Sequence, residues 1–305
     1  MNDNTLIKNH LLIIQKHFKN YNSVPSLDLK TNVYQSVLIA SFAKALEFNL
    51  FLYKNRSAKN SFFHSPFLRG LCEDLITLKF IGKNFSYDKE QLIESYMFYL
   101  LLHSMLAQKS FLDKAVPFQQ FPLFKDLDTL IETREAELKN LMKNNGLNKE
   151  RLFPSVEHMA IDAQLKHLYD FLYHATSRMV HFSPNILLRM GWYKKDGPTV
   201  FSTHNFHKYY DQFNKFYAAY LLLEFCDSFK KQMKFKEDIL KEFKQIKKIL
   251  LADAFYPELV TFEELNMKRP SNLFINFLTE LAKQNPDRDV ANDSEIKRVF
   301  GKLNM

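Results

Sequence analysis

Two stretches decide the fold prediction: YDFLYHATSRMVHFSPN at residues 169–185 and SPFLRGLCEDLITLKF at residues 65–80. Both are apolar at helical spacing, and both carry polar residues that recur at the same spacing. We find this combination at no other place in the sequence. The two stretches therefore predict two helices that pack in a core and share a polar feature.

In the later stretch, and just before it, polar side chains follow one another in steps of three and four residues. They form one stripe of a predicted helix that runs from the N-cap Ser155 to residue 181. The stripe consists of His167, Asp170, His174, Ser177 and His181. A nearly opposite apolar stripe, which predicts the core-facing side, consists of Leu165, Leu168, Leu172, Ala175, Met179 and Phe182. The polar stripe is either a solvated face or, since three histidines are unusual on such a face, the wall of a cleft.

The earlier stretch has a clear helix start. Ser65 is a good N-cap, and Pro66 occupies the first turn, where its missing N–H costs nothing. Arg69 and Glu73 are four residues apart and so face the same way. Because Arg69 and Glu73 are surrounded by apolar residues, which predict a largely buried helix, these two charges need partners. We expect either an internal Arg69–Glu73 ion pair that fixes helix packing or a functional site built on the same residues.

The two stretches together resemble a known pattern. The runs FLRGLCEDLITLKFIGKN and YDFLYHATSRMVHFSP are similar to those of an uncharacterised, widely distributed family of bacterial all-helical proteins, a domain of unknown function. The family pattern is Arg-x-Leu-x-Glu on one helix and Tyr-x-x-x-Ser-x-x-x-His, then a small residue, on a later one. The matching residues are Arg69, Leu71, Glu73, Tyr173, Ser177, His181 and Ser183. The resemblance covers roughly residues 35–229 and carries no established activity.

A more distant similarity links these helices to the nuclease-like helical domains of toxin and phage-defence systems. Those domains are marked by an arginine and a histidine with four to six residues between them. This chain departs from that spacing, because two residues separate Arg178 from His181 and seven separate Arg56 from His64. The similarity implies a defence-associated role and, as an activity, that of a nuclease.

Composition favours an all-α protein. The chain has 305 residues with only 6 glycines, 30 phenylalanines and 46% hydrophobic residues, which predicts long helices around an aromatic core. We expect an antiparallel multi-helix bundle at residues 1–251 and a short helical C-terminal tail at residues 252–305. The aromatic residues around Asp196-Gly197 predict one β-hairpin at residues 192–201. Helices are expected at residues 4–20, 32–54, 65–84, 87–112, 127–144, 155–181, 183–190, 206–231 and 235–251.

Other features bear on location and chemistry. Cys72 and Cys226 lie in apolar runs and are expected to be buried free thiols in a reducing compartment. No N-terminal signal and no run of 18 apolar residues stands out, so we expect a cytoplasmic protein without a membrane span. A net charge of +8 permits an acidic partner without requiring one.

Several chemistries lack their sequence motifs. Glycine-rich phosphate loops, the Gly-x-Ser-x-Gly elbow and His-Glu-x-x-His are all missing, so we expect no cofactor and no metal. One weaker possibility is that His167, Asp170 and His174 hold a single metal ion on a helix face.

Two hypotheses for function remain. In the first, the chain is an interaction or defence-associated module, in which Arg69, Glu73, Ser177 and His181 form a buried hydrogen-bonded clasp between two helices. Its partner would then be another protein or a second copy of the chain. In the second, the same four residues are catalytic: His181 is the acid or base, Ser177 orients it or is activated by it, Arg69 holds a phosphate and Glu73 orients Arg69 or His181. That site would bind or cleave RNA without a metal.

Overall fold

The computed structural model is almost entirely helical. It describes residues 3–18, 32–55, 58–85, 90–115, 127–145, 152, 154–193, 198–205 and 207–252. The predicted tail at residues 252–305 therefore lies outside the described residues except for Ala252, where the last helix ends. In the described part, the prediction of an all-α bundle with one short hairpin is confirmed.

The described elements follow one another as a run of helices interrupted once by the hairpin. They are α1 (Asp3–Phe18), α2 (Val33–Lys54), the 3₁₀ helix η1 (Ala58–His64), α3 (Ser65–Phe85), α4 (Glu90–Ala115), α5 (Leu127–Asn144), α6 (Val156–Asp162), α7 (Lys166–Val180), α8 (Pro184–Arg189), β1 (Gly191–Tyr193), β2 (Thr199–Phe201), α9 (His207–Phe229) and α10 (Glu237–Ala252).

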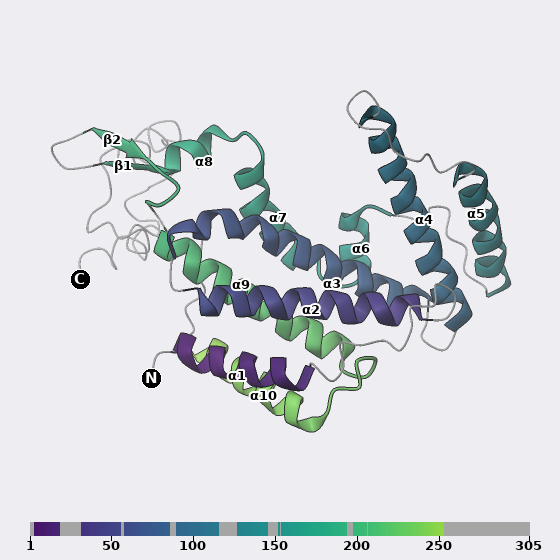
Figure 1. Cartoon of the computed structure of the whole chain (residues 1–305), viewed down its shortest axis with the longest axis horizontal. Coiled ribbons are helices and arrows are strands. Elements are labelled where there is room, and N and C mark those ends of the chain that lie inside the picture. Colours follow the sequence, from purple (N-terminus) through teal and green to yellow (C-terminus); the bar gives the residue numbers. More distant parts are fainter. Residues whose placement is uncertain are drawn as a thin grey trace, which may run out of the picture.

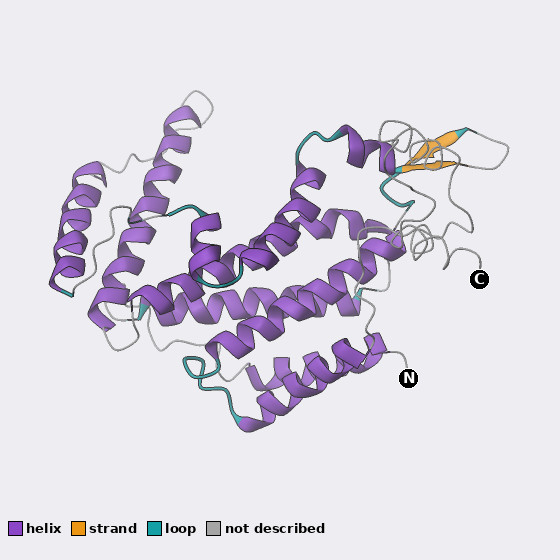
Figure 2. Cartoon of the chain, turned by 180° about the vertical axis from the view of Figure 1, so that it is seen from behind, coloured by secondary structure: helices purple, strands orange, loops and turns teal. Residues whose placement is uncertain are grey.

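Three long helices, α2, α3 and α9, form the centre of the bundle and contact one another (Figure 1). The antiparallel pair α1 and α10 packs on α2 and α9 along one side. On the other side α6 and α7 pack on α3, while α4 and α5 form a pair at one end. Figure 2 shows from behind that the hairpin lies at the opposite end of the molecule from α4 and α5.

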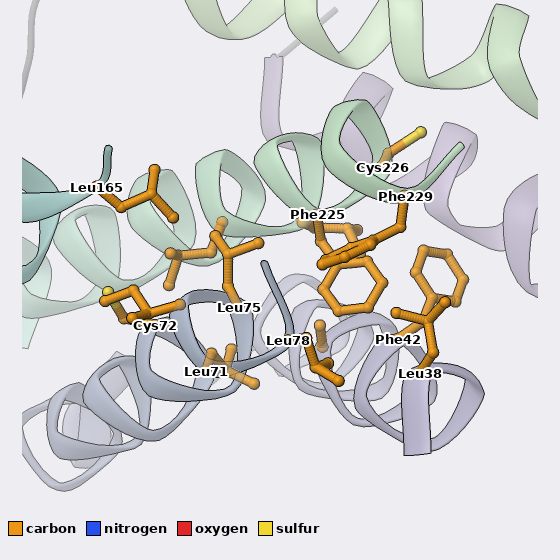
Figure 3. Close-up of a cluster of buried hydrophobic side chains, with 14 of the residues drawn as sticks. Leu38, Phe42, Leu71, Cys72, Leu75, Leu78, Leu165, Phe225, Cys226 and Phe229 are labelled. Atoms are coloured by element: carbon orange, nitrogen blue, oxygen red, sulfur yellow. The ribbon is translucent and has the colours of Figure 1, made fainter. Parts of the chain in front are cut away.

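The core is aromatic, as the composition predicts. Phe42 of α2 lies at its centre, with ring contacts to Phe225 of α9 at 5.7 Å and to Phe235 at 5.0 Å between centroids. Leu71 and Leu75 of α3 face the same cluster (Figure 3). These side chains are almost fully buried, and each large one contributes about 1.5–3 kcal/mol on burial. Because these apolar side chains offer no hydrogen-bond partners, a polar group in the centre must find its partner elsewhere, and few polar side chains are buried there.

Both cysteines are buried free thiols, as predicted. Cys72 lies on the core side of α3 and Cys226 on α9 (Figure 3). Burial raises the pKa of each thiol to about 12. Because the thiolate is the reactive form, both groups are chemically inert in this fold.

The prediction of one long helix at residues 155–181 is wrong in one respect: this stretch forms two helices, α6 and α7. Ser155 caps only α6, with its hydroxyl accepting from the His158 amide. The chain then turns at Gln164, which has a φ of 59°. The Leu165 amide donates to the Ala160 carbonyl and the Gln164 amide to the Ile161 carbonyl, which is a Schellman ending. Because glutamine rather than glycine takes the left-handed position, the sequence carried no stop signal.

The sequence predicts a polar connection at residues 55–64, but much of this connection is helical and partly buried. Residues 58–64 form η1, and Ser61 and Phe62 are buried. Since η1 runs directly into α3, Ser65 is a buried first residue rather than an N-cap, and its hydroxyl donates to the Ser61 carbonyl. The start of α3 is thus fixed by packing on η1 and α9.

One helix in the described part of the chain, α2, is long and apolar enough to cross a membrane by those two measures. It lies inside the bundle, where ten of its residues are buried against α1, α3, α4 and α9. A core helix passes the same two measures.

The hairpin pairs β1 and β2 antiparallel, with Trp192 opposite Val200. Its turn, residues 194–197, lies outside the described residues. Two contacts hold it to the end of α8: the Ser202 amide and the Asn205 side chain both donate to the Met190 carbonyl. The Phe201 ring lies so close to Gly191 that an added Cβ would meet it at 3.0 Å.

Candidate functional site

The site predicted from sequence lies where α3 packs against α7. The α6–α7 segment runs antiparallel to α3, because Arg69 near the start of α3 contacts Tyr173, whereas Asn84 near its end donates to Asp162 of α6 at 2.9 Å. Buried leucines close the interface: Leu68, Leu71, Leu75, Leu165, Leu168 and Leu172. This packing sets which side chains of the two helices meet.

The Arg69 group, which we define as Arg69, Glu73 and Tyr173, lies at the edge of this interface. Arg69 Nε donates to Glu73 Oε1 at 2.7 Å, as the spacing of four residues predicts. The guanidinium carbon lies 4.5 Å from the centre of the Tyr173 ring on α7. The hydrogen bond to Glu73 raises the pKa of Arg69 above its ordinary value, although partial burial opposes the shift. The group therefore joins one fixed cation to a carboxylate and an aromatic face.

The prediction that Arg69 and Glu73 form part of a buried clasp is wrong about their burial. The Arg69 and Glu73 side chains are 34% and 31% exposed. An ion pair at this exposure contributes only a few tenths of a kcal/mol, and the cation–π contact about 0.5–1 kcal/mol. The pair lies at the edge of the α3–α7 contact because α7 buries its leucines deeper than its tyrosines.

Ser177 and His181 lie beyond Tyr173 along α7, toward the C-terminal end of that helix. Ser177 is one helical turn beyond Tyr173, and His181 is two turns beyond it, about 12 Å along the axis. His181 is the C-cap of α7, with an exposed side chain and its amide donating to the Ser177 carbonyl at 3.0 Å. Among the described residues, neither side chain has a hydrogen bond or ion pair with Arg69 or Glu73.

The rest of the polar stripe faces solvent. His167 and His174 are exposed, and Asp170 pairs with Lys166 on its own helix. In the part of the chain that the structure describes, no group of three or more histidine, cysteine or acidic side chains could hold a metal ion. The interpretation of the stripe as a solvated face therefore fits the described geometry better than a cleft wall.

A second group of the same kind was missed by the sequence reasoning. We define the Lys215 group as Lys215 and Asp211 of α9 with Tyr53 of α2. Lys215 Nζ donates to Asp211 Oδ2 at 2.5 Å and lies 6.0 Å from the centre of the Tyr53 ring. The Tyr53 hydroxyl donates to the Lys215 carbonyl at 3.2 Å. These charged side chains are only 13% and 22% exposed.

Neighbouring residues respond to this group electrostatically. Burial, with a further contribution from Asp211, raises the pKa of Tyr53 well above its ordinary value. Burial lowers the pKa of His64 at the end of η1, and Asp211 opposes this shift. Asp211 thus acts on groups from both α2 and η1, and it links three elements.

Two buried amides lie beside the Lys215 group. Asn49 Nδ2 donates to the Ala45 and Ala218 carbonyls, and Asn214 Nδ2 donates to the Ser61 carbonyl at 2.7 Å. The Oδ1 atoms of both residues are buried without a hydrogen-bond partner in the described structure. These bonds tie α2 and η1 to α9. Lys215 and Asp211 are four apart, so the spacing used for Arg69 and Glu73 was available here too.

An aromatic surface is formed by side chains of α2, the end of η1 and the start of α3. We define it as Phe48, Phe51, His64 and Phe67. The Phe48 ring lies 4.5 Å from Phe67 and 6.5 Å from Phe51, and the Phe51 ring lies 4.9 Å from His64, all between centroids. Phe51 and Phe67 are both exposed. Lys44 lies 5.5 Å from the Phe67 ring centre and pairs with Asp74, which gives this surface a polar edge.

Comparison with known proteins adds the family relationship. Residues 64–199 match the model of a family of unknown function (DUF5677). The match includes α3, the Arg69 group, Ser177 and His181, but it leaves out α1, α2, α9 and α10, so it is shorter than the resemblance predicted for residues 35–229. Searches of curated proteins and of solved structures gave no match.

Proposed function

We propose that this chain is a protein-binding module whose binding surface is the aromatic surface of α2 and α3. The observation that carries the proposal is that Phe51 and Phe67, from two helices, are exposed and are joined through the Phe48 ring. Exposed apolar groups that adjoin one another and carry a polar edge are typical of interaction sites. A defence-associated role for this binding is part of the proposal and rests on the distant resemblance of the helix motifs.

The Arg69 group supports the proposal by supplying structure rather than chemistry. Arg69 contacts Glu73 on its own helix and Tyr173 on the next, so it helps hold α3 in place on α7. Phe67 lies two residues before Arg69 and on another side of α3, where it packs against Phe48. A fixed α3 keeps Phe67 in place relative to α2, which an exposed binding surface needs.

The partner chemistry follows from the surface. Aromatic rings beside Lys44 suit an apolar segment with an acidic residue next to it, because the lysine contributes a charge at the edge. Lys44 already pairs with Asp74, so an acidic residue of the partner would compete for a cation whose side chain is 39% exposed. A second copy of the chain is the other protein partner consistent with this surface.

The test is site-specific photo-crosslinking in cells that express the full chain. A photoreactive phenylalanine analogue replaces Phe51 in one protein and Phe67 in another, and a third protein carries it at Leu130. Leu130 of α5 is a matched control because its side chain has a similar exposure. We expect positions 51 and 67 to capture the same protein and position 130 not to capture it. Capture equal at all three positions, or capture of RNA alone, would contradict the proposal.

RNA cleavage stays as a second candidate because of one observation. Glu73 accepts from Arg69 Nε, and the two terminal nitrogens of Arg69 have no hydrogen-bond partner among the described residues. Those nitrogens could bind a phosphate. Its test is a cleavage assay of the purified parent on single-stranded RNA beside His181→Ala and Arg69→Ala. Cleavage by the parent that both variants abolish would favour this candidate over the binding module.

A further inference from the structure

A second exposed apolar region lies at the hairpin end of the molecule. We call it the α7–β2 surface and define it by six side chains that follow one another from the end of α7 to β2: Val180, Phe182, Leu187, Leu188, Val200 and Phe201. Phe182 is 85% exposed, and all three residues of β2 are exposed. This region contrasts with the first half of α7, where Leu168 and Leu172 are buried.

Physical reasons indicate that something covers this surface. A two-stranded hairpin alone is marginally stable in water, and it gains stability from a further strand or from a helix packed on its face. Here both faces of β2 are exposed in the described structure. Clusters of exposed apolar groups are also unusual on a protein that stays soluble without a partner.

The chain itself supplies a suitable occupant. Residues 271–282, SNLFINFLTELA, carry Phe274, Phe277, Leu278 and Leu281 at the spacing i, i+3, i+4 and i+7. This spacing predicts an amphipathic helix with one apolar face, and Ser271 after Pro270 is a good N-cap. Such a helix needs an apolar surface to cover its face.

The end of α10 lies close enough for this segment to reach the surface. Both views place the last turn of α10 at the end of the bundle where the hairpin lies (Figures 1 and 2). Residues 253–270 separate Ala252 from the segment, and a chain of that length spans at most about 60 Å. This reach exceeds the width of a small domain, so the connection does not limit docking.

We infer that residues 271–282 bind the α7–β2 surface of the same molecule and cover the hairpin. The segment contributes the apolar face that the hairpin lacks, and α8 and the end of α7 contribute the other side of the contact. The inference does not depend on the proposed binding function, which concerns the aromatic surface of α2 and α3.

The first test changes the segment in the full-length chain. Phe277→Asp with Leu278→Asp places two charges on the apolar face, and Asn276→Asp with Thr279→Asp is the matched control on the opposite face. In hydrogen exchange followed by mass spectrometry, we expect the first variant to exchange about tenfold or more faster in residues 271–282 and 198–202, because docking no longer protects them. The control should match the parent. Equal exchange in all three proteins would overturn the inference.

The second test changes the surface instead of the segment. Phe182→Asp with Leu188→Asp should release residues 271–282 to the same extent, and Ile161→Asp, an exposed apolar position on α6, is the control. The seven side chains changed in these tests are either exposed, as Phe182, Leu188 and Ile161 are, or outside the described residues, so the bundle should fold in every variant.

The mass of the parent in solution distinguishes docking within one molecule from docking between two copies. Sedimentation of the parent should give a monomer while residues 271–282 are protected, since the segment covers its own molecule. Protection that appears only in a dimer would mean that a second copy supplies the segment, which overturns the inference. Slow hydrogen exchange at the α7–β2 surface with fast exchange in residues 271–282 would mean that another partner covers the surface. That result would also overturn the inference.

Discussion

The Arg69 group and the Lys215 group are built alike and are buried to different degrees. Each has a cation and a carboxylate four residues apart on one helix, and each cation lies over a tyrosine ring of a neighbouring helix. The Arg69 pair is about one-third exposed, whereas the Lys215 pair is mostly shielded. Because water screens the first pair more than the second, the same arrangement should stabilise the fold to different extents.

The largest effect is expected from Lys215→Ala. The substitution leaves the Asp211 carboxylate without its cation in a shielded place, so the free energy of unfolding should fall by about 2–3 kcal/mol. Urea denaturation of the parent and the variant measures this difference. A double variant, Lys215→Met with Asp211→Leu, should recover much of the loss because it leaves no charge unpaired. A loss below that of Arg69→Ala would contradict the comparison.

A smaller effect is expected from Arg69→Ala. The variant loses a partly exposed ion pair and the contact with the Tyr173 ring, which together contribute about 1 kcal/mol. The same urea experiment applies, with Lys139→Ala on α5 as a control for an exposed pair of the same spacing. Combining Arg69→Ala with Tyr173→Leu should give less than the sum of the two losses, because the variants remove a shared contact. Full additivity would show that the ring contact contributes nothing.

The next effect depends on pH and involves His64 beside the Lys215 group. Burial lowers the pKa of His64 in the folded chain below its ordinary value of 6.5. Below about pH 6.5 the unfolded chain therefore binds more protons, so stability is complete above that pH and falls as the pH drops through the folded pKa. His64→Gln should flatten this part of the stability curve. Urea midpoints measured between pH 7 and pH 5 test this, and parallel curves for parent and variant would refute it.

The smallest effect on stability is expected from His181→Ala. Its ring is exposed at the C-cap of α7, and in the described structure it has no hydrogen bond or ion pair with Arg69 or Glu73. The sequence alone predicts that His181→Ala and Arg69→Ala behave alike, since it places both residues in one site. The structure instead predicts an unchanged urea midpoint for His181→Ala. A drop equal to that of Arg69→Ala would restore the predicted four-residue site.

The sequence predicted what depends on spacing within one helix. The Arg69–Glu73 pair and the limits of α5 follow from such local spacing, and both are confirmed. The contacts of Tyr173 and Tyr53 depend on which helices become neighbours, and no local spacing states that. The turn at Gln164 was missed because a glutamine took the place usually held by glycine.

The same limit explains the site residues. Ser177 and His181 follow the helical spacing of the polar stripe. That spacing predicts that they share one face of a helix, but it does not predict which neighbouring helix or solvent that face contacts. Asn49 and Asn214 are single amides in otherwise apolar helices, and both are fully buried and join α2 and η1 to α9. A search for lone amides in apolar helices could have pointed to them.

The turn at Gln164 also fixes how α7 is rotated about its own axis. Asp162, just before the turn, is held by Lys83 and Asn84 at the end of α3, while Tyr173 after it reaches Arg69 near the start. One residue added or removed between these anchors would rotate α7 by about 100° and carry Tyr173 away from Arg69. Evolution can therefore change the side chains of this helix pair more readily than the number of residues in its turn. In an alignment of relatives, insertions should avoid residues 163–165 even where Arg69 or Tyr173 has been replaced.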